Sequence, residues 1–271
     1  MQNYCMADFI DQTKRKITLD KFPSRIISVV PSQTELLHSL ELNEEVIGIT
    51  KFCLHPEEWF RNKTRVGGTK QLNIDQIKKL NPDLIIANKE ENVKEQIEEL
   101  EKDFPVWVSD VNNLNDAYEM IIQIGLLTNK THQAQTLTRQ IKEEFSRLQT
   151  PDYRLRTIYL IWQKPYMTIG RDTFTHSMLE AAGFENIFKS KTRYPETTID
   201  ELQTANCQLL LLSSEPFPFK QKHIEKLQPQ LPGTKIILVD GEMFSWYGSR
   251  LLKAPEYFLL LKKTILSEVR H

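Results

Sequence analysis

The feature that most constrains the fold is a helical stretch in the middle of the chain, from Asn115 to about Leu148. Its apolar residues recur at steps of three and four, except across the polar run TNKTHQ, which is the spacing of one buried helix face. Asn115 suits an N-cap and Pro151 follows the last turn, so both ends carry stop signals. At 1.5 Å per residue such a helix spans about 50 Å, enough to brace two small domains. The alternative is two shorter helices broken near Gly125 or Asn129, since Gly costs about 1 kcal/mol inside a helix.

The sequence on either side of this stretch is long enough for two α/β lobes. The chain has 271 residues, which fits one large domain or two of about 110 residues each. Lys plus Arg number 35 against 36 Asp plus Glu, so the charge indicates neither a nucleic-acid partner nor an anionic membrane surface. No run approaches the length of apolar sequence that crosses a bilayer. A small-molecule ligand is the remaining expectation.

The cysteines and the N-terminus bear on the compartment. Cys5, Cys53 and Cys207 are an odd number without CxxC spacing, so we interpret them as structural thiols and not as a metal or redox site. The first residues, MQNYCMADFIDQTKRK, lack the apolar run of a signal peptide, and no such run precedes Cys5 to make it a lipoprotein acceptor. As written, the sequence looks cytosolic, although a start site chosen too far downstream or a trimmed chain would look identical.

The first half alternates predicted strands and helices, which indicates a parallel sheet. Strands are expected at residues 25–30, 46–50, 84–87 and 105–108. After Pro31, Ser32 and Glu35 have the spacing of a capping box that would open a helix. The exit of the second strand carries Phe52 and His55, and strand exits in open α/β sheets are where ligands bind.

The second half has the same organisation, and one of its segments is similar in sequence to a segment of the first half. Strands are expected at residues 156–162, 209–213 and 235–240, with one helix ended by Gly183 and an amphipathic helix from Ser249 onward. The run NIDQIKKLNPDLII, from Asn73, aligns without a gap with TIDELQTANCQLLL, from Thr198. Chance is the alternative explanation, because each run is merely a capped helix followed by a strand. We interpret this similarity as a structural repeat.

Several segments together resemble a known family. The segments are RIISVVPSQTELLHSL, LNIDQIKKLNPDLIIA, the central helical stretch, and GFENIF followed by YP and an acidic helix start. Together they resemble the substrate-binding proteins of iron-siderophore, haem and vitamin B12 ABC importers. The vitamin B12 binders are the closest, and the resemblance covers about residues 25–265. It implies an α/β fold of the class III periplasmic-binding-protein type. Two parallel-sheet lobes (1–110 and 151–271) would be joined by a single linking backbone helix (111–150).

The resemblance also implies a function. A corrinoid, haem or ferric-siderophore ligand would be captured between the lobes of a monomer and delivered to an ABC permease dimer. No tightly bound cofactor, metal site or catalytic residue is expected. The family acts outside the cytoplasm, whereas this sequence shows no signal peptide or lipobox. The resemblance therefore favours an extracytoplasmic protein, and a cytoplasmic one stays open.

Individual ligand contacts follow from the same resemblance. The candidates are Phe52, His55, Trp162, Tyr166, Tyr194, Phe244, Trp246 and Arg250. Aromatic rings suit a flat macrocycle because each buries a large apolar area, and Arg250 is expected to be free to pair with an acidic group on the ligand. Core packing explains Trp162 and Trp246 equally well. Positions that hold Trp in the B12 binders hold Thr69 and Asn88 here, which leaves the first lobe poor in aromatic side chains.

Two carboxylates are candidates for docking a partner. In the family, one Glu on each lobe pairs with Arg side chains of the permease subunits. The matching positions hold Asp75 and Asp200, with Glu201 beside the second. Simple helix capping is the alternative, since the helix dipole favours a carboxylate in the first turn.

Two other classes stay open. A two-lobed α/β enzyme, such as a sugar transferase or a reductase component, would show a chemical motif, but the sequence contains no GxGxxG, P-loop, HExxH or GxSxG. The histidines show no catalytic pair. A cytosolic carrier of corrinoids or metal complexes, working without a transporter, is the other alternative.

Overall fold

The structure is a computed structural model, and it describes residues 7–148 and 154–268. Cys5, Pro151 and His271 therefore lie outside the described residues. The chain forms two compact units. Unit 1 comprises Met1–Val111, Asn115–Gln140 and Tyr247–Arg250, and unit 2 comprises Asn112–Leu114, Ile141–Trp246 and Leu251–His271.

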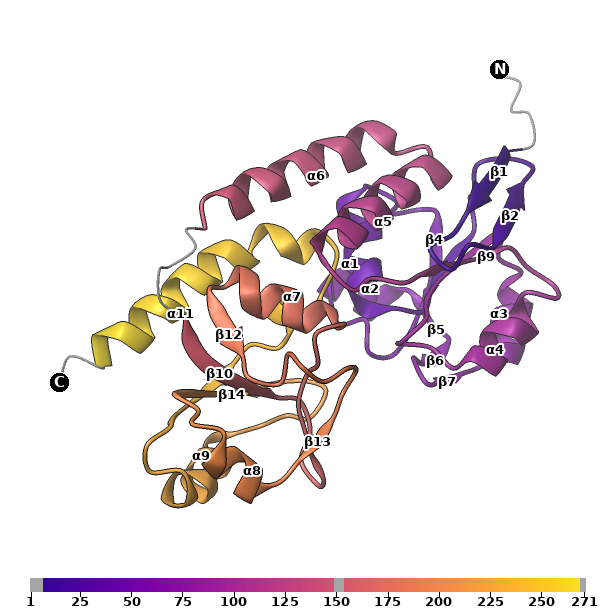
Figure 1. Ribbon diagram of the computed structural model, residues 1–271. Coiled ribbons are helices and arrows are strands. Elements are labelled where there is room, and N and C mark those ends of the chain that lie inside the picture. Colours follow the sequence, from indigo (N-terminus) through magenta and orange to yellow (C-terminus); the bar gives the residue numbers. More distant parts are fainter. Residues whose placement is uncertain (1–6, 149–153, 269–271) are drawn as a thin grey trace. The chain divides into compact units, whose positions relative to one another are not determined.

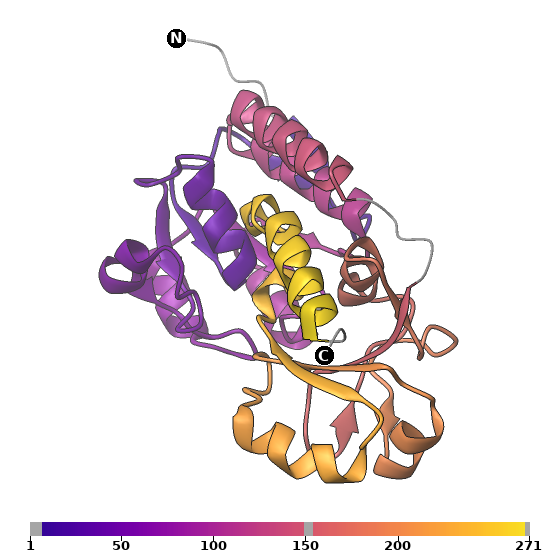
Figure 2. The ribbon, with the colours of Figure 1, turned by 90° about the vertical axis from the view of Figure 1, so that its left-hand side faces the viewer.

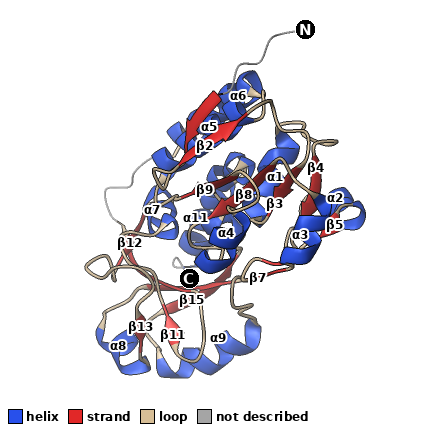
Figure 3. Cartoon of the chain, turned by 90° about the vertical axis from the view of Figure 1, so that its right-hand side faces the viewer, coloured by secondary structure: helices blue, strands red, loops and turns tan. Residues whose placement is uncertain are grey.

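Unit 1 is built on a five-stranded sheet in which every pair of neighbours is parallel. In sheet order its strands are β5 (Thr64–Arg65), β4 (Val46–Ile49), β3 (Ile26–Ser28), β8 (Leu84–Asn88) and β9 (Val106–Ser109). Every residue of β3, β8 and β9 is buried, as expected of parallel strands covered on both faces. The helices that flank these strands (Figure 3) are α1 (Pro31–Ser39), α2 (Glu57–Asn62), α3 (Ile74–Leu80), α4 (Lys94–Leu100) and most of α5 (Leu114–Leu127).

Two short hairpins complete unit 1. One pairs β6 (Gly67–Gly68) with β7 (Gln71–Leu72), and the other pairs β1 (Ala7–Ile10) with β2 (Lys16–Leu19). The turn of the second hairpin covers the outer edge of β9. There the Asp11 carboxylate accepts a hydrogen bond from the Val108 amide at 3.3 Å, and the Gln12 side chain accepts one from the Asp110 amide at 3.1 Å. Because an open edge invites pairing with another strand, these contacts protect it.

The predicted capping box at the start of α1 is wrong. Helix α1 begins at Pro31, and no side chain caps its N-terminus. Pro at the first helical position needs no hydrogen-bond partner for its nitrogen, so the helix starts there without the Ser32 hydroxyl. Glu35 is used elsewhere, as described below.

The middle stretch forms two helices, α5 (Leu114–Leu127) and α6 (Thr131–Ser146), which lie side by side (Figures 1 and 2). The predicted continuous helix is therefore wrong, and the alternative break near Asn129 is right. Asn129 adopts a left-handed conformation with φ 58°, and the Lys130 amide donates to the Gly125 carbonyl at 2.7 Å. A Cβ on Gly125 would lie 2.3 Å from the Cβ of Ala134. This glycine thus allows α6 to turn back against α5.

Unit 2 is built on a four-stranded parallel sheet, and it also contains a separate two-stranded antiparallel sheet. In sheet order the strands of the larger sheet are β12 (Phe184–Asn186), β10 (Leu155–Leu160), β14 (Leu209–Ser213) and β15 (Lys235–Val239). The smaller sheet pairs β11 (Tyr166–Met167) with β13 (Glu196–Thr197). Its helices are α7 (Phe174–Ala181), α8 (Ile199–Thr204), α9 (Gln221–Leu227), the 3-10 turn η1 (Gln228–Gln230), α10 (Glu242–Ser245) and α11 (Ala254–Glu268). A further 3-10 turn, η2 (Ser249–Leu252), runs from the unit 1 residues into α11. Gly183 follows α7 with φ 84°, which confirms its predicted role in ending that helix.

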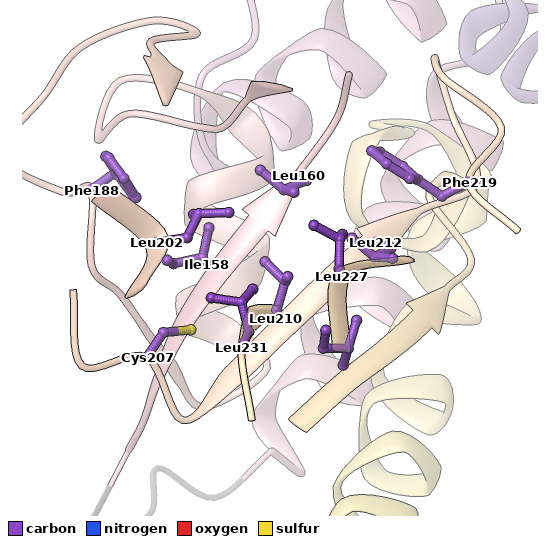
Figure 4. Close-up of a cluster of buried hydrophobic side chains, with 11 residues drawn as sticks. Ile158, Leu160, Phe188, Leu202, Cys207, Leu210, Leu212, Phe219, Leu227 and Leu231 are labelled. Carbon is purple, nitrogen blue, oxygen red and sulfur yellow. The ribbon is translucent and has the colours of Figure 1, made fainter. Parts of the chain in front are cut away.

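One buried apolar cluster holds α8 and α9 against the sheet of unit 2 (Figure 4). The strands β10 and β14 supply Ile158, Leu160, Leu210 and Leu212, which are at most 1% exposed. Helices α8 and α9 supply Leu202 and Leu227. Burying each such side chain contributes about 1.5–3 kcal/mol. The other face of this sheet is covered by α7 and α11 (Figure 1).

The structure confirms the repeat. Asn73 and Thr198 are the N-caps of α3 and α8, and each side chain accepts the backbone amide three residues later, at 3.0 and 3.2 Å. Each helix is followed by an asparagine in the left-handed conformation, Asn81 with φ 44° and Asn206 with φ 50°. The next strand, β8 or β14, then pairs with the first strand of its own sheet, β3 or β10.

An arginine at the start of that first strand closes the repeated module in each unit. The Nε of Arg25 donates to the carbonyl of Asn81 at 3.1 Å, and the Nε of Arg156 donates to the carbonyl of Asn206 at 3.2 Å. Their Nη2 atoms bond the preceding carbonyls, Leu80 and Ala205. Both arginines therefore cap the carboxyl end of the repeated helix, where cations are favoured.

Candidate functional site

In unit 1, the loop after β4 presents an aromatic side chain to solvent. Phe52 is 52% exposed, and His55 is half-buried in the same loop. Beneath them the fully buried thiol of Cys53 lies 3.1 Å from the hydroxyl of Thr34 and 3.2 Å from that of Thr50. Burial raises the pKa of the Cys53 thiol above its ordinary value, so this cysteine is an unreactive anchor of the loop, as the sequence indicated.

Two buried asparagines tie together the other strand exits of unit 1. The side-chain amide of Asn92 donates to the carbonyls of Val29, after β3, and Thr69, in the β6–β7 turn, both at 3.1 Å, and its oxygen accepts the Asn88 amide at 2.8 Å. Asn88 in turn donates to the Ser109 hydroxyl at 2.9 Å, at the end of β9. The loops at this edge are thereby held in fixed register. Asn88 therefore has a structural role in unit 1.

Arg250 is engaged within unit 1, which contradicts the expectation that it is free for a ligand. Its Nε lies 3.0 Å and its Nη2 2.9 Å from the two carboxylate oxygens of Glu35 on α1, and the two side chains are 8% and 14% exposed. The backbone at Gly248 lies close to α1, since a Cβ on Gly248 would be 2.7 Å from the carbonyl oxygen of Ser32. This ion pair, in which Nε donates the hydrogen bond, anchors Tyr247–Arg250 to unit 1. The sequence contained no signal for it, because the partners lie 215 positions apart.

In unit 2, the loops after β10 and β14 form an aromatic surface. Trp162 is 40% exposed, and its ring meets that of Phe217 edge to face at 5.7 Å. Tyr166 lies half-buried on β11, with its hydroxyl 3.4 Å from the Nε2 of Gln163, and Tyr194 is half-buried just before β13. Trp162 pairs with Met167 in a β-bridge, so Trp162 and Tyr166 lie in the same turn after β10 but on opposite faces of it. Phe217 was not predicted from the sequence, although it follows β14 as Phe52 follows β4 and the strand-exit rule applies to both.

Two aromatic candidates are packed inside unit 2. Phe244 is fully buried, with its ring 5.1 Å from Tyr159 and 4.8 Å from Phe258. Trp246 is 7% exposed and donates its indole N–H to Glu215 at 3.0 Å. These contacts give both side chains a packing role, because α10 and the chain after it must cover the sheet. For Trp246 this is the core-packing alternative.

The docking candidates lie in the first turns of α3 and α8. Asp75, Asp200 and Glu201 are all exposed. Glu201 forms a capping box with Thr198, since its carboxylate accepts the Thr198 amide at 3.1 Å. Asp75 and Asp200 therefore occupy equivalent places in the repeated module, while Glu201 is occupied in capping.

Among the side chains described, those of residues 7–148 and 154–265, no three of His, Cys, Asp or Glu lie close enough to hold a metal ion. In the same ranges no helix is both long and apolar enough to cross a membrane. His223 serves as a cap, because its Nδ1 accepts the Lys220 amide at 2.7 Å, and desolvation lowers its pKa.

These observations define a class of protein. Two parallel α/β sheets present exposed aromatic side chains at the carboxyl ends of their strands, where open α/β sheets bind small molecules. The chain belongs to the periplasmic binding protein family, whose model matches residues 26–232.

Known relatives agree with this assignment. The chain is 26% identical over 242 residues to the vitamin B12-binding protein of Pectobacterium carotovorum subsp. carotovorum, with 86% of each chain covered. The haem-binding protein HutB of Vibrio cholerae shares the fold with a TM-score of 0.74 at 20% identity, covering 88% of this chain and 98% of that one. The siderophore-binding protein BauB does so with a TM-score of 0.77 at 19% identity, covering 93% and 97%. The two structural likenesses show a shared fold.

Proposed function

We propose that this protein captures a bulky metal complex of the corrinoid, haem or ferric-siderophore class and delivers it to an ABC permease. The observation that carries the proposal is the exposed ring of Trp162, with the half-buried ring of Phe217 against it, at the strand exits of a periplasmic binding protein fold. A flat metal complex offers a large apolar area to such rings. The names of similar proteins, which bind vitamin B12, haem and a ferric siderophore complex, support the same ligand class.

A matched pair of variants tests the ligand surface. Trp162→Ala removes a ring that is 40% exposed, and Leu126→Ala removes an equally exposed apolar side chain from α5. The affinity for cyanocobalamin, haemin and a ferric siderophore is measured by absorbance titration. We expect Trp162→Ala to weaken binding about tenfold, corresponding to about 1.4 kcal/mol, and Leu126→Ala to leave it unchanged. Equal affinities of wild type and Trp162→Ala would contradict the proposal.

Delivery to a permease is the second part of the proposal. Asp75 and Asp200 are suited to pair with cationic side chains because each is exposed in the first turn of an equivalent helix. The N-caps Asn73 and Thr198 are separate residues, so the double change Asp75→Asn and Asp200→Asn leaves the caps in place. We expect little loss of stability, and weaker association with the permease together with a smaller salt dependence. Association that the double change leaves unaltered would exclude the docking role.

The proposal also implies where the protein works. Delivery to an importer takes place on the outer side of the membrane, and one chain suffices to carry one ligand, so we propose an extracytoplasmic monomer. Protease accessibility in intact cells and the mass of the purified protein in solution test these two statements. Protection from protease in intact cells, or a stable dimer, would contradict them.

A further inference from the structure

Lys51 and Phe52, next to each other after β4, place a cation beside an exposed ring. Both side chains are exposed, and the Nζ of Lys51 lies 5.2 Å from the centroid of the Phe52 ring. Other lysines at this edge are engaged: the Nζ of Lys89 lies 2.6 Å from the Asp110 carboxylate, and Lys70 donates to a backbone carbonyl. Lys51 forms no ion pair with any residue in the described ranges. Its charge is therefore available to a ligand.

A glycine beneath this pair determines where the two side chains lie. A Cβ on Gly68 would be 3.0 Å from Cε2 of Phe52 and 3.2 Å from Cε of Lys51. Both side chains thus rest against the bare backbone of β6. The backbone of the loop is fixed as well, since the Lys51 amide donates to the Gly67 carbonyl at 2.8 Å and the Phe52 amide to the Thr50 hydroxyl at 3.3 Å.

We infer that Lys51 and Phe52 form a two-part ligand subsite, in which Phe52 packs against an apolar ring and Lys51 pairs with an anionic oxygen at the edge of that ring. The inference rests on the proposed function and narrows its ligand. Haem carries carboxylates at its rim, and a ferric catecholate complex carries phenolate oxygens beside its rings, whereas the rim of cyanocobalamin carries uncharged amides. A ligand with an uncharged rim would cover Lys51 without compensating its charge, which is unfavourable.

Three single changes distinguish the effect of the Lys51 charge from the effect of where the Lys51 and Phe52 side chains lie. Lys51→Met removes the charge and keeps an apolar stem of similar length. Gly68→Ala leaves both side chains present but introduces a methyl group that pushes them from the β6 backbone. Gly233→Ala is the matched control, because a Cβ on Gly233 would meet no atom within 4 Å. Affinities are measured by absorbance titration for haemin, a ferric tris-catecholate and cyanocobalamin, at low and at high salt.

The subsite predicts a specific pattern. Wild type binds an anionic probe, haemin or the ferric tris-catecholate, and Lys51→Met weakens that binding about tenfold and reduces its salt dependence. Gly68→Ala weakens it in the same direction, while Gly233→Ala matches wild type. If Lys51→Met and Gly68→Ala bind the anionic probes as wild type does, or if wild type binds only cyanocobalamin, the subsite is refuted and the proposed function stands. Failure of wild type to bind any of the three probes refutes the proposed function itself, and the subsite with it.

Discussion

Removing the negative charge of Glu35 is predicted to destabilise the protein markedly. Glu35 pairs with Arg250 through a hydrogen bond from Nε and a close approach of Nη2, and the two side chains are only 14% and 8% exposed. Removing one partner of a buried pair costs about 3–5 kcal/mol, since the attraction between the two charges is lost away from water. Because Glu35 keeps some solvent contact, we expect about 3 kcal/mol for Glu35→Gln. For a chain of this length that corresponds to a fall in melting temperature of about 6–12 °C.

The assay is thermal unfolding followed by circular dichroism, with an exposed pair as control. Glu57 and Arg61 form an ion pair across one turn of α2, with side chains 74% and 71% exposed. Such surface pairs contribute at most about 1 kcal/mol, so Glu57→Gln should leave the melting temperature nearly unchanged. If Glu35→Gln lowers it no more than Glu57→Gln does, the reasoning about the buried pair is refuted.

Two further predictions concern packing and pH. Gly125→Ala places a methyl group 2.3 Å from the Cβ of Ala134, so despite a gain of about 1 kcal/mol in helix propensity we expect a net loss of about 1–2 kcal/mol in urea unfolding; a stabilised variant would show that the two helices do not pack there. His223→Asn retains an acceptor for the Lys220 amide but does not titrate. Because the native pKa of His223 is lowered, the unfolded chain binds the proton first, and the free energy of unfolding of wild type should fall as pH drops below about 6.5. His223→Asn should lose part of that dependence, and identical pH profiles would contradict the assignment.

The alternation of strands and helices was predictable from sequence because local patterns determine it. Buried parallel strands such as β8 and β14 are continuous apolar runs, and the caps Asn73 and Thr198 mark the helices before them. The gapless alignment of these two segments was therefore a reliable signal of the repeat. The arginines that close each module could not be found in this way, since their partners are backbone carbonyls about 50 positions away.

The central stretch shows where periodicity misleads. Apolar spacing continues on both sides of the polar run TNKTHQ, so it supports one helix or two equally well. The decision rests on Asn129 in a left-handed conformation and on Gly125 against Ala134, which are tertiary features. A capped break of this kind leaves the hydrophobic pattern intact.

The candidate site was only partly predictable. The strand-exit rule located Phe52 and Trp162 in exposed loops, because the loop that follows a strand can be read directly from the chain. It could not separate exposed from buried aromatic side chains after β15, where Phe244 faces the core. Nor could it show that Arg250 has a carboxylate partner on α1. Burial and long-range pairing depend on the packing of distant segments.

The measurement that tests the account most directly is the unfolding of the wild-type protein with and without ligand. Cyanocobalamin, haemin and a ferric siderophore are each added in excess, and the melting temperature and the ligand's absorbance spectrum are recorded. A ligand that binds the native state at 100 times its dissociation constant stabilises it by about 2.7 kcal/mol, a rise of about 5–11 °C for a chain of this length. We expect such a rise for at least one of the three ligands, together with a spectral change that saturates at one ligand per chain. No shift and no spectral change with any of them would contradict it.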